Sequence, residues 1–198
     1  MAQIPLTVAA AIAVLTLPLT AQTAPRKTDE QFDASTKAHE HEYDYLIGDW
    51  EFTATNKQFG PFNGRWSALK LEEGQILDEY RIVDDSGATT YMTTTFRNWN
   101  AGLDQWELIG THPGGGLRDF GTGKMVGSEM RIEQTFGVAR GNTSILRIRY
   151  YNIRPDAFTW TADRSTDGGK TWTVAWQTIE AHRIGPPRSL GRITPAKP

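Results

Sequence analysis

From residue 48 onward, apolar and polar residues alternate in runs of about six to ten, separated by Gly, Asn, Asp or Pro. Such alternation is typical of strands with one buried face. The connections are short and no long helical pattern intervenes, so consecutive strands are expected to pair antiparallel. Ten such strands predict a closed all-β barrel, because closure removes unpaired edges. The runs begin near Trp50, Gly64, Gln75, Thr89, Gln105, Arg118, Glu129, Ser144, Phe158 and Thr171.

The first 24 residues have a different pattern. Ile4 to Ala21 include no charged residue, and the small residues from Thr20 to Ala24 suit a signal peptidase. We predict that residues 1–24 are a bacterial signal peptide, so the mature protein is periplasmic or secreted and has no stable membrane span after cleavage. A retained N-terminal anchor is the alternative, because the first Lys or Arg is Arg26.

Three further segments complete the expected organisation. Residues 25–47 are predicted to form a linker and a short helix that begins at the N-cap residue Thr28 and ends before Gly48. Residues 48–184 form the barrel, and residues 185–198 are a flexible tail containing Pro and Arg.

Composition narrows the classes of function. The chain has 198 residues, of which 38% are hydrophobic and 11% aromatic, and this composition suits one soluble β-rich domain. It has no cysteine, which excludes disulfides and thiolate ligands. The net charge is -2 with scattered Lys and Arg, so nucleic acid is not an expected partner. No metal site is predicted, because His39 and His41 diverge on a helix.

The segment "STDGGKTW" has the composition of a tight hairpin turn. Ser165 and Asp167 can accept backbone N–H groups, Gly169 allows a positive φ, and Trp172 is expected to point into the base or wall of the barrel. The same signature recurs once per blade in sialidase-type propellers, but this chain has one full copy and is short for several blades. The motif therefore predicts a structural turn.

Several motifs resemble those of a known family. "YLIGDWEF" contains Gly48 and Trp50 and resembles the Gly-x-Trp opening of lipocalin-like calycin barrels, in which the Trp closes the barrel base near a short N-terminal helix. "GRWSALKLEEGQILDEYRI", "TTTFRNWNAGLDQWELIG" and "FTWTADRSTDGGKTWTVAWQTIEAHRI" resemble the DUF1579-like group of bacterial lipocalin-like proteins, whose function is unassigned. The resemblance covers roughly residues 43 to 184. It implies an up-and-down lipocalin-like barrel and no particular chemistry.

Basic and aromatic residues within the strand runs predict a lined cavity. Its ligand would be a small, partly apolar molecule with an acidic or aromatic group, held by Arg side chains among Trp and Tyr walls. The alternative for Arg147 and Arg149 is that they face solvent and pair with acidic residues on neighbouring strands. The candidate ligand-binding residues are Tyr91, Arg97, His112, Arg147, Arg149, Trp176 and His182.

An isomerase, lyase or hydrolase on the same barrel is a second hypothesis. His112, Tyr91 and Arg97 would act as acid, base and anion clamp, or His182 would transfer the proton. The Gly-rich segment from Thr111 to Lys124 lacks P-loop spacing and is expected to be a flexible hairpin loop at the barrel mouth.

A haem protein is the third hypothesis. The chain has a more distant resemblance to nitrobindin-type haem barrels, which have a Gly-x-Trp start and a proximal His on a late strand. The resemblance implies haem as cofactor with His182 as axial ligand. Outside this alternative no cofactor is expected.

Overall fold

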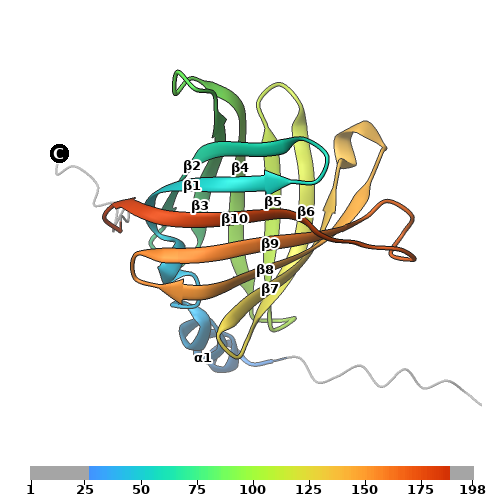
Figure 1. The fold of residues 1–198 in the computed structure, drawn as a ribbon. Coiled ribbons are helices and arrows are strands. Elements are labelled where there is room, and N and C mark those ends of the chain that lie inside the picture. The colour runs from blue at the N-terminus through green and yellow to red at the C-terminus, as the bar shows by residue number, and fades with distance from the viewer. Residues whose placement is uncertain (1–26, 188–198) are drawn as a thin grey trace, which may run out of the picture.

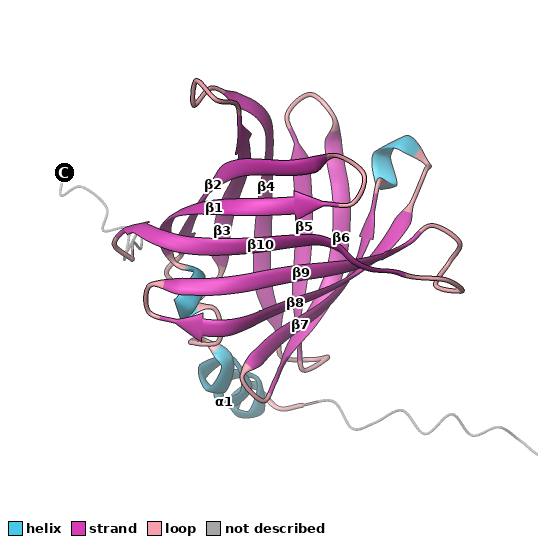
Figure 2. Cartoon of the chain, viewed as in Figure 1, coloured by secondary structure: helices cyan, strands magenta, loops and turns pink. Residues whose placement is uncertain are grey.

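The computed structural model describes residues 27–187 and confirms the predicted all-β barrel of ten antiparallel strands with a short N-terminal helix. The strands close in the order β1-β10-β9-β8-β7-β6-β5-β4-β3-β2, so every sequential pair is adjacent (Figures 1 and 2). Among the strand starts, the largest difference from prediction is at β2, which begins at Gly60 instead of Gly64. The predicted helix is shorter than expected, because α1 ends at His39 and a separate 3₁₀ turn precedes Gly48. The strands are β1 (Gly48–Asn56), β2 (Gly60–Lys70), β3 (Ile76–Val83), β4 (Thr89–Asn100), β5 (Gln105–His112), β6 (Gly116–Val126), β7 (Glu129–Phe136), β8 (Ser144–Arg154), β9 (Ala157–Ser165) and β10 (Thr173–Gly185).

One end of the barrel, here called the closed end, is covered by the helix α1 (Asp29–His39) and the short 3₁₀ helix η1 (Asp44–Leu46), as Figure 1 shows. Thr28 and Gln31 form a capping box that starts α1. The Trp99 indole donates a hydrogen bond to Ser35 in α1 at 3.0 Å. This contact holds the helix against the closed-end terminus of β4.

The closed half of the barrel interior is filled by aromatic side chains. Trp50 and Trp106 are fully buried, and the Trp50 ring meets Phe158 edge to face at 4.8 Å between centroids. The Trp50 indole donates to the Leu46 carbonyl at 2.8 Å, which ties β1 to η1. The Gly-x-Trp motif thus contributes a residue that seals the closed end, because the ring lies between the barrel core and the capping segment.

The opposite end, here called the open end, carries short hairpins. The segment from Thr111 to Lys124, predicted as a flexible loop, is a strand for most of its length, since β6 begins at Gly116. Only residues 113–115 connect it to β5. That prediction was wrong because glycines also occur inside strands, and Gly121 and Gly123 lie within the ladder with β7.

Residues 1–24, predicted to be a signal peptide, lie outside the described residues, as do residues 188–198 of the predicted tail. Within residues 27–187 the structure has no helix of the length and apolar character needed to cross a membrane.

Candidate functional site

A buried ion pair joins β3 and β4 inside the closed half of the barrel. The Arg97 guanidinium donates to the Asp78 carboxylate at 2.6 Å, and the two side chains are 3% and 1% exposed. Arg97 also donates to the hydroxyls of Tyr43 and Tyr150, each at 3.3 Å, while the Trp66 indole donates to Asp78 at 2.8 Å. The network satisfies both charges with groups of the chain itself.

Arg97 therefore does not form a site with Tyr91 and His112. Burial alone would lower the pKa of Arg97, but the Asp78 carboxylate and the two tyrosines outweigh it and hold that pKa above its ordinary value. Tyr91 lies toward the open end of the same strand, six residues earlier. The predicted grouping of His112, Tyr91 and Arg97 is wrong. Residues an even number of positions apart on one strand point to the same face, but on a long strand they lie at different heights along the barrel axis.

A cluster of polar side chains at the open end, here called the rim cluster, consists of Tyr91, His112, Arg118, Asp119 and Gln134. Arg118 donates to the Tyr91 hydroxyl at 2.7 Å and forms an ion pair with Asp119, which also accepts a hydrogen bond from Gln134. The His112 ring lies 5.3 Å from the Tyr91 ring. Arg118 thus occupies the position beside Tyr91 that was predicted for Arg97.

Asp119 is the buried centre of the rim cluster. It is fully buried, and burial raises the pKa of its carboxyl, although Arg118 and Gln134 oppose the rise. A Cβ at Gly110, the facing residue on β5, would collide with this carboxylate, so a glycine is needed there. The Arg118 guanidinium lies 4.5 Å from the centroid of the Phe136 ring. The Arg118–Asp119 ion pair is therefore held in one position, although the Arg118 side chain stays 18% exposed.

His112 has a defined orientation within the cluster. Its Nδ1 lies 2.8 Å from the Pro113 carbonyl oxygen. A carbonyl can only accept, so Nδ1 carries the hydrogen and, in the neutral ring, Nε2 is left as an acceptor.

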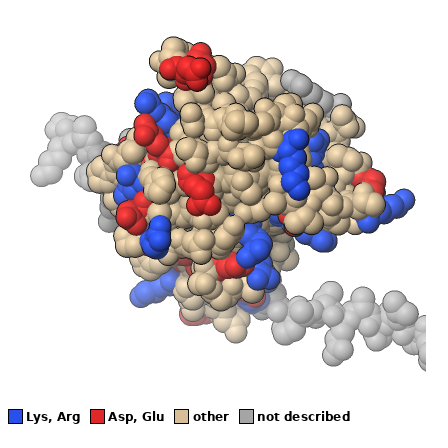
Figure 3. Space-filling view, viewed as in Figure 1, with Lys and Arg blue, Asp and Glu red and all other residues tan. Residues whose placement is uncertain are grey.

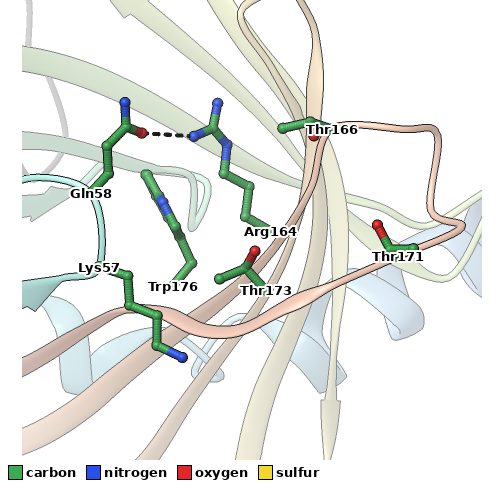
Figure 4. A pocket seen from close by; sticks show the side chains of 7 residues that line it. All are labelled: Lys57, Gln58, Arg164, Thr166, Thr171, Thr173 and Trp176. Carbon is green, nitrogen blue, oxygen red and sulfur yellow. Dashed lines mark hydrogen bonds between the residues drawn. The ribbon is translucent and has the colours of Figure 1, made fainter.

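A hollow of about 290 Å³, here called the Arg164 pocket, lies at the open end between the β1–β2 turn and the β9–β10 hairpin (Figure 4). Arg164 donates to Gln58 at 3.1 Å, and its guanidinium lies 4.9 Å from the Trp176 ring. The Lys57 ammonium donates to the Val174 carbonyl at 2.7 Å. The lining residues are Lys57, Gln58, Arg164, Thr166, Thr171, Thr173 and Trp176.

A break in the β9–β10 ladder makes room for this pocket. Thr173 pairs with Arg164 and the next paired residue is Gln177, while Ala175 between them has a φ of 46°. The regular alternation of inward and outward side chains along β10 therefore does not extend across the break. Trp176, one of the predicted ligand-binding residues, lies in the pocket because of it.

Arg147 and Arg149 lie on the outer wall, as in the alternative that the sequence left open. Arg147 pairs with Glu133 at 3.3 Å and Arg149 with Glu129 at 2.6 Å, and all these contacts are to neighbouring strands. The inward face of β8 carries Tyr150 and other apolar side chains instead. On the face drawn in Figure 3, acidic and basic side chains are interspersed in the same way.

The "STDGGKTW" turn is held by its own side chains. Ser165 accepts from the Gly169 amide at 2.8 Å, and Asp167 accepts from the amides of Lys170 and Thr171 at 3.0 and 2.9 Å. Gly169 has a φ of 89°, which favours glycine.

Trp172 does not point into the barrel. Its ring packs on the outer wall, where the Arg147 guanidinium lies 4.0 Å from its centroid, and its indole donates to the Gly169 carbonyl at 3.0 Å. The expected orientation was wrong because the turn folds the ring back against its own glycine before β10 begins at Thr173.

His182 is exposed on the outer wall of β10 and lines a second hollow of about 410 Å³ with Glu180 and Arg154. An axial ligand must reach the iron from inside the barrel if haem occupies the interior. On β10 the buried residues Ile179 and Ala181 alternate with Glu180 and His182, so His182 faces away from the interior. The residues present therefore do not fit an interior haem bound through His182.

Several residues at the open end were not identified from the sequence. Arg118 and Asp119 are adjacent in the chain yet both contribute to one inward cluster, because the β5–β6 register shifts between Gly110 and Thr111. The signal for Asp119 in the sequence is that an acidic residue stands within a Gly-rich strand. Among residues 27–187 no group of three or more His, Asp or Glu side chains is placed to hold a metal ion.

Comparison with known proteins supports the barrel fold. A crystal structure of Rv2717c from M. tuberculosis matches with a TM-score of 0.52 and 16% identity, covering 76% of this chain and 97% of that chain. A redesigned β-barrel, b11L5F_LGL, gives a TM-score of 0.39 and 13% identity over 73% of this chain and 96% of that chain. No family model matches the chain, and no curated protein matches it in sequence. At these identities the similarity shows the fold and not the function.

Proposed function

We propose that the protein binds a small aromatic acid at the open end of the barrel, in the Arg164 pocket. The observation that carries the proposal is the chemistry of the lining, which combines two cationic side chains, an indole and three threonine hydroxyls without a carboxylate. Such a lining favours an anion through charge-assisted hydrogen bonds and an aromatic ring through stacking on the indole.

The pocket has the right position for this task. It lies at the end of the barrel opposite α1, between the β1–β2 turn and the β9–β10 hairpin (Figure 4). Gln58 already holds one nitrogen of the Arg164 guanidinium, and the Trp176 ring lies against the same group. An arginine held on two sides loses little conformational entropy when it binds an anion.

The test is calorimetric titration of benzoate into wild-type protein and two variants. Arg164→Ala should weaken affinity about tenfold or more, since it removes a charge-assisted contact. Arg147→Ala is the matched control, because Arg147 packs on Trp172 in the same way on the outer wall. Equal weakening in both variants, or no binding to wild type, would contradict the proposal.

We also propose that the protein is exported by bacteria and functions in the periplasm or outside the cell. The uncharged run from Ile4 to Ala21 supports this. Determining the N-terminal residue of the protein from the source cell tests it: cleavage near Ala24 is expected, and an intact N-terminus in a soluble cytoplasmic fraction would contradict it.

A further inference from the structure

Four exposed apolar side chains lie side by side on the outer wall of the barrel, across the adjacent strands β3, β4, β5 and β6. Leu77 pairs with Phe96, and Phe96 pairs with Ile109. Ile109 in turn pairs with Phe120, so the four form one continuous line, here called the apolar row. Each is between 37% and 50% exposed. Single exposed apolar residues are common, but a contiguous group is typical of an interaction surface.

The neighbouring part of the outer wall has a different character. On β7 and β8 the outward side chains include Arg131 and Arg149, which pair with Glu129, and Arg147, which pairs with Glu133. Ion pairs of this kind leave a surface well hydrated. The apolar row is therefore a local feature of β3–β6 and not the general composition of the barrel wall.

The charges that border the apolar row are already paired. Within the described strands β3–β6, the outward positions next to the row carry two charged side chains, Glu79 and Glu107. Glu79 forms an ion pair with Arg81, and Glu107 accepts a hydrogen bond from the Asn100 side chain at 2.8 Å. Such a surface does not repel a copy of itself and offers little to a charged partner. The net charge of -2 and the two bordering carboxylates also disfavour an anionic lipid surface.

The closure of the barrel and the size of the wall fit a second copy packed face to face. A closed barrel has no free strand edge, so a partner cannot add a strand and must lie on the wall. Four strands about 4.8 Å apart, with four outward positions about 7 Å apart along each strand, cover roughly 500 Å². Two such walls in contact would bury roughly 1,000 Å², which is at the lower limit for a specific interface and predicts a weak, reversible dimer.

We propose that the apolar row is the interface of a two-fold symmetric dimer, in which the row of one copy packs on the row of a second copy. A neutral apolar surface is complementary to itself, and a two-fold contact between identical surfaces closes, so association stops at two chains. The row lies on β3–β6, whereas the Arg164 pocket lies at the β1–β2 turn and the β9–β10 hairpin. The proposal therefore extends beyond the proposed function and does not depend on it.

Sedimentation equilibrium of the protein purified from the source cell measures the association. The mass should rise from one chain toward two between about 1 and about 100 µM, the range that suits a contact of this size. Ile109→Arg places a charge in the middle of the row, once in each copy, and should weaken the dimer at least about a hundredfold. Ile184→Arg is the matched control and should associate as wild type does, because Ile184 is 55% exposed on β10, halfway around the barrel from β5.

A mixture of two variants tests whether the partner is a second copy. Ile109→Glu should also stay a single chain, but an equimolar mixture with Ile109→Arg should regain the mass of two chains, because opposite charges then face each other. Ile109 is 49% exposed, so both variants should keep the urea unfolding midpoint of wild type. If either charged variant fails to fold, Ile109→Thr keeps the β-branched shape and should weaken the dimer about tenfold.

The interface would be overturned by wild type that stays a single chain at about 100 µM, by a mass that grows past two chains, or by equal association of wild type and Ile109→Arg. A single chain that instead sediments with phosphatidylcholine vesicles would assign the row to a lipid surface. Benzoate titration of Ile109→Arg should equal that of wild type, so a failure of the dimer and a failure of the Arg164 pocket are separate results.

Discussion

Two Arg–Asp pairs lie inside the barrel, one at each end, and their surroundings differ. The pair Arg97–Asp78 at the closed end is buried on both sides, with every charged atom facing tyrosine, tryptophan or its partner. The pair Arg118–Asp119 at the open end has a buried carboxylate and a guanidinium that is 18% exposed. The first pair is sealed by the chain's own groups, and the second leaves a charged group within reach of solvent and ligands.

The difference separates a sealed ion pair from one that is partly accessible to solvent. A buried ion pair with full hydrogen bonding contributes a defined geometry. Removing one partner leaves the other charge buried without compensation. A pair with one exposed partner can exchange a water for a ligand at little cost. Residue type alone therefore does not predict how far each pair is buried, and the position along the barrel axis does.

The largest effect is expected from breaking the closed-end pair. Asp78→Ala leaves the Arg97 charge and the Trp66 indole without their acceptor, and we expect a loss of about 3–5 kcal/mol in the free energy of unfolding. Urea unfolding followed by tryptophan fluorescence measures it. The double variant Arg97→Met with Asp78→Leu should lose much less, since no charge is left unpaired. A loss below about 1 kcal/mol in Asp78→Ala would show that the pair does not organise the core.

A smaller, pH-dependent effect is expected at the open end. The pKa of Asp119 is raised above its ordinary value of 3.8, so the folded state holds the proton to a higher pH than the unfolded state does. Its ionisation therefore lowers stability as pH rises from about 4 through the folded pKa, by at most about 1.4 kcal/mol per pH unit. Asp119→Asn removes this dependence.

Urea unfolding of wild type and Asp119→Asn from pH 4 to pH 7 checks the sign. The stability of wild type relative to the variant should fall as pH rises. A relative stability that rises over this range would mean that Arg118 lowers the pKa of Asp119 more than burial raises it.

The smallest effect is expected at an aspartate outside the barrel interior. Hydrogen bonds from Thr171, first its side chain and then its amide, lower the pKa of Asp167 to about 2. Its contribution is therefore present above about pH 4 and is lost as pH falls toward 2. Asp167→Ala should lower the melting temperature by about 2–4 °C at pH 7, with benzoate binding little altered.

Differential scanning calorimetry at pH 7 and pH 3 checks this. The difference in melting temperature between wild type and Asp167→Ala should shrink at the lower pH. Loss of benzoate binding with an unchanged melting temperature would place Asp167 in a binding site instead of a turn.

The fold was more predictable than the site. Alternation of apolar and polar residues predicts ten strands because each strand buries one face, and that rule needs no knowledge of the other strands. The site depends on which inward residues meet. Arg97 and Tyr91 share a face of β4 but lie at different heights along the barrel axis, and the pairing of Arg147 with Glu133 follows from the register of β8 with β7. Neither relation is contained in one strand's pattern.

The strand count, the helix at the N-terminal side and the chemistry of the "STDGGKTW" turn follow from the sequence, because these depend on contacts between residues close in the chain. Which charges are sealed and which are accessible depends on contacts between distant strands. Irregularities at Arg118 on β6 and around Ala175 on β10 shift the register, so they bring Arg118 next to Tyr91 and Trp176 next to Arg164. These side-chain contacts depend on how all the strands pair around the closed barrel, which no local segment of sequence encodes.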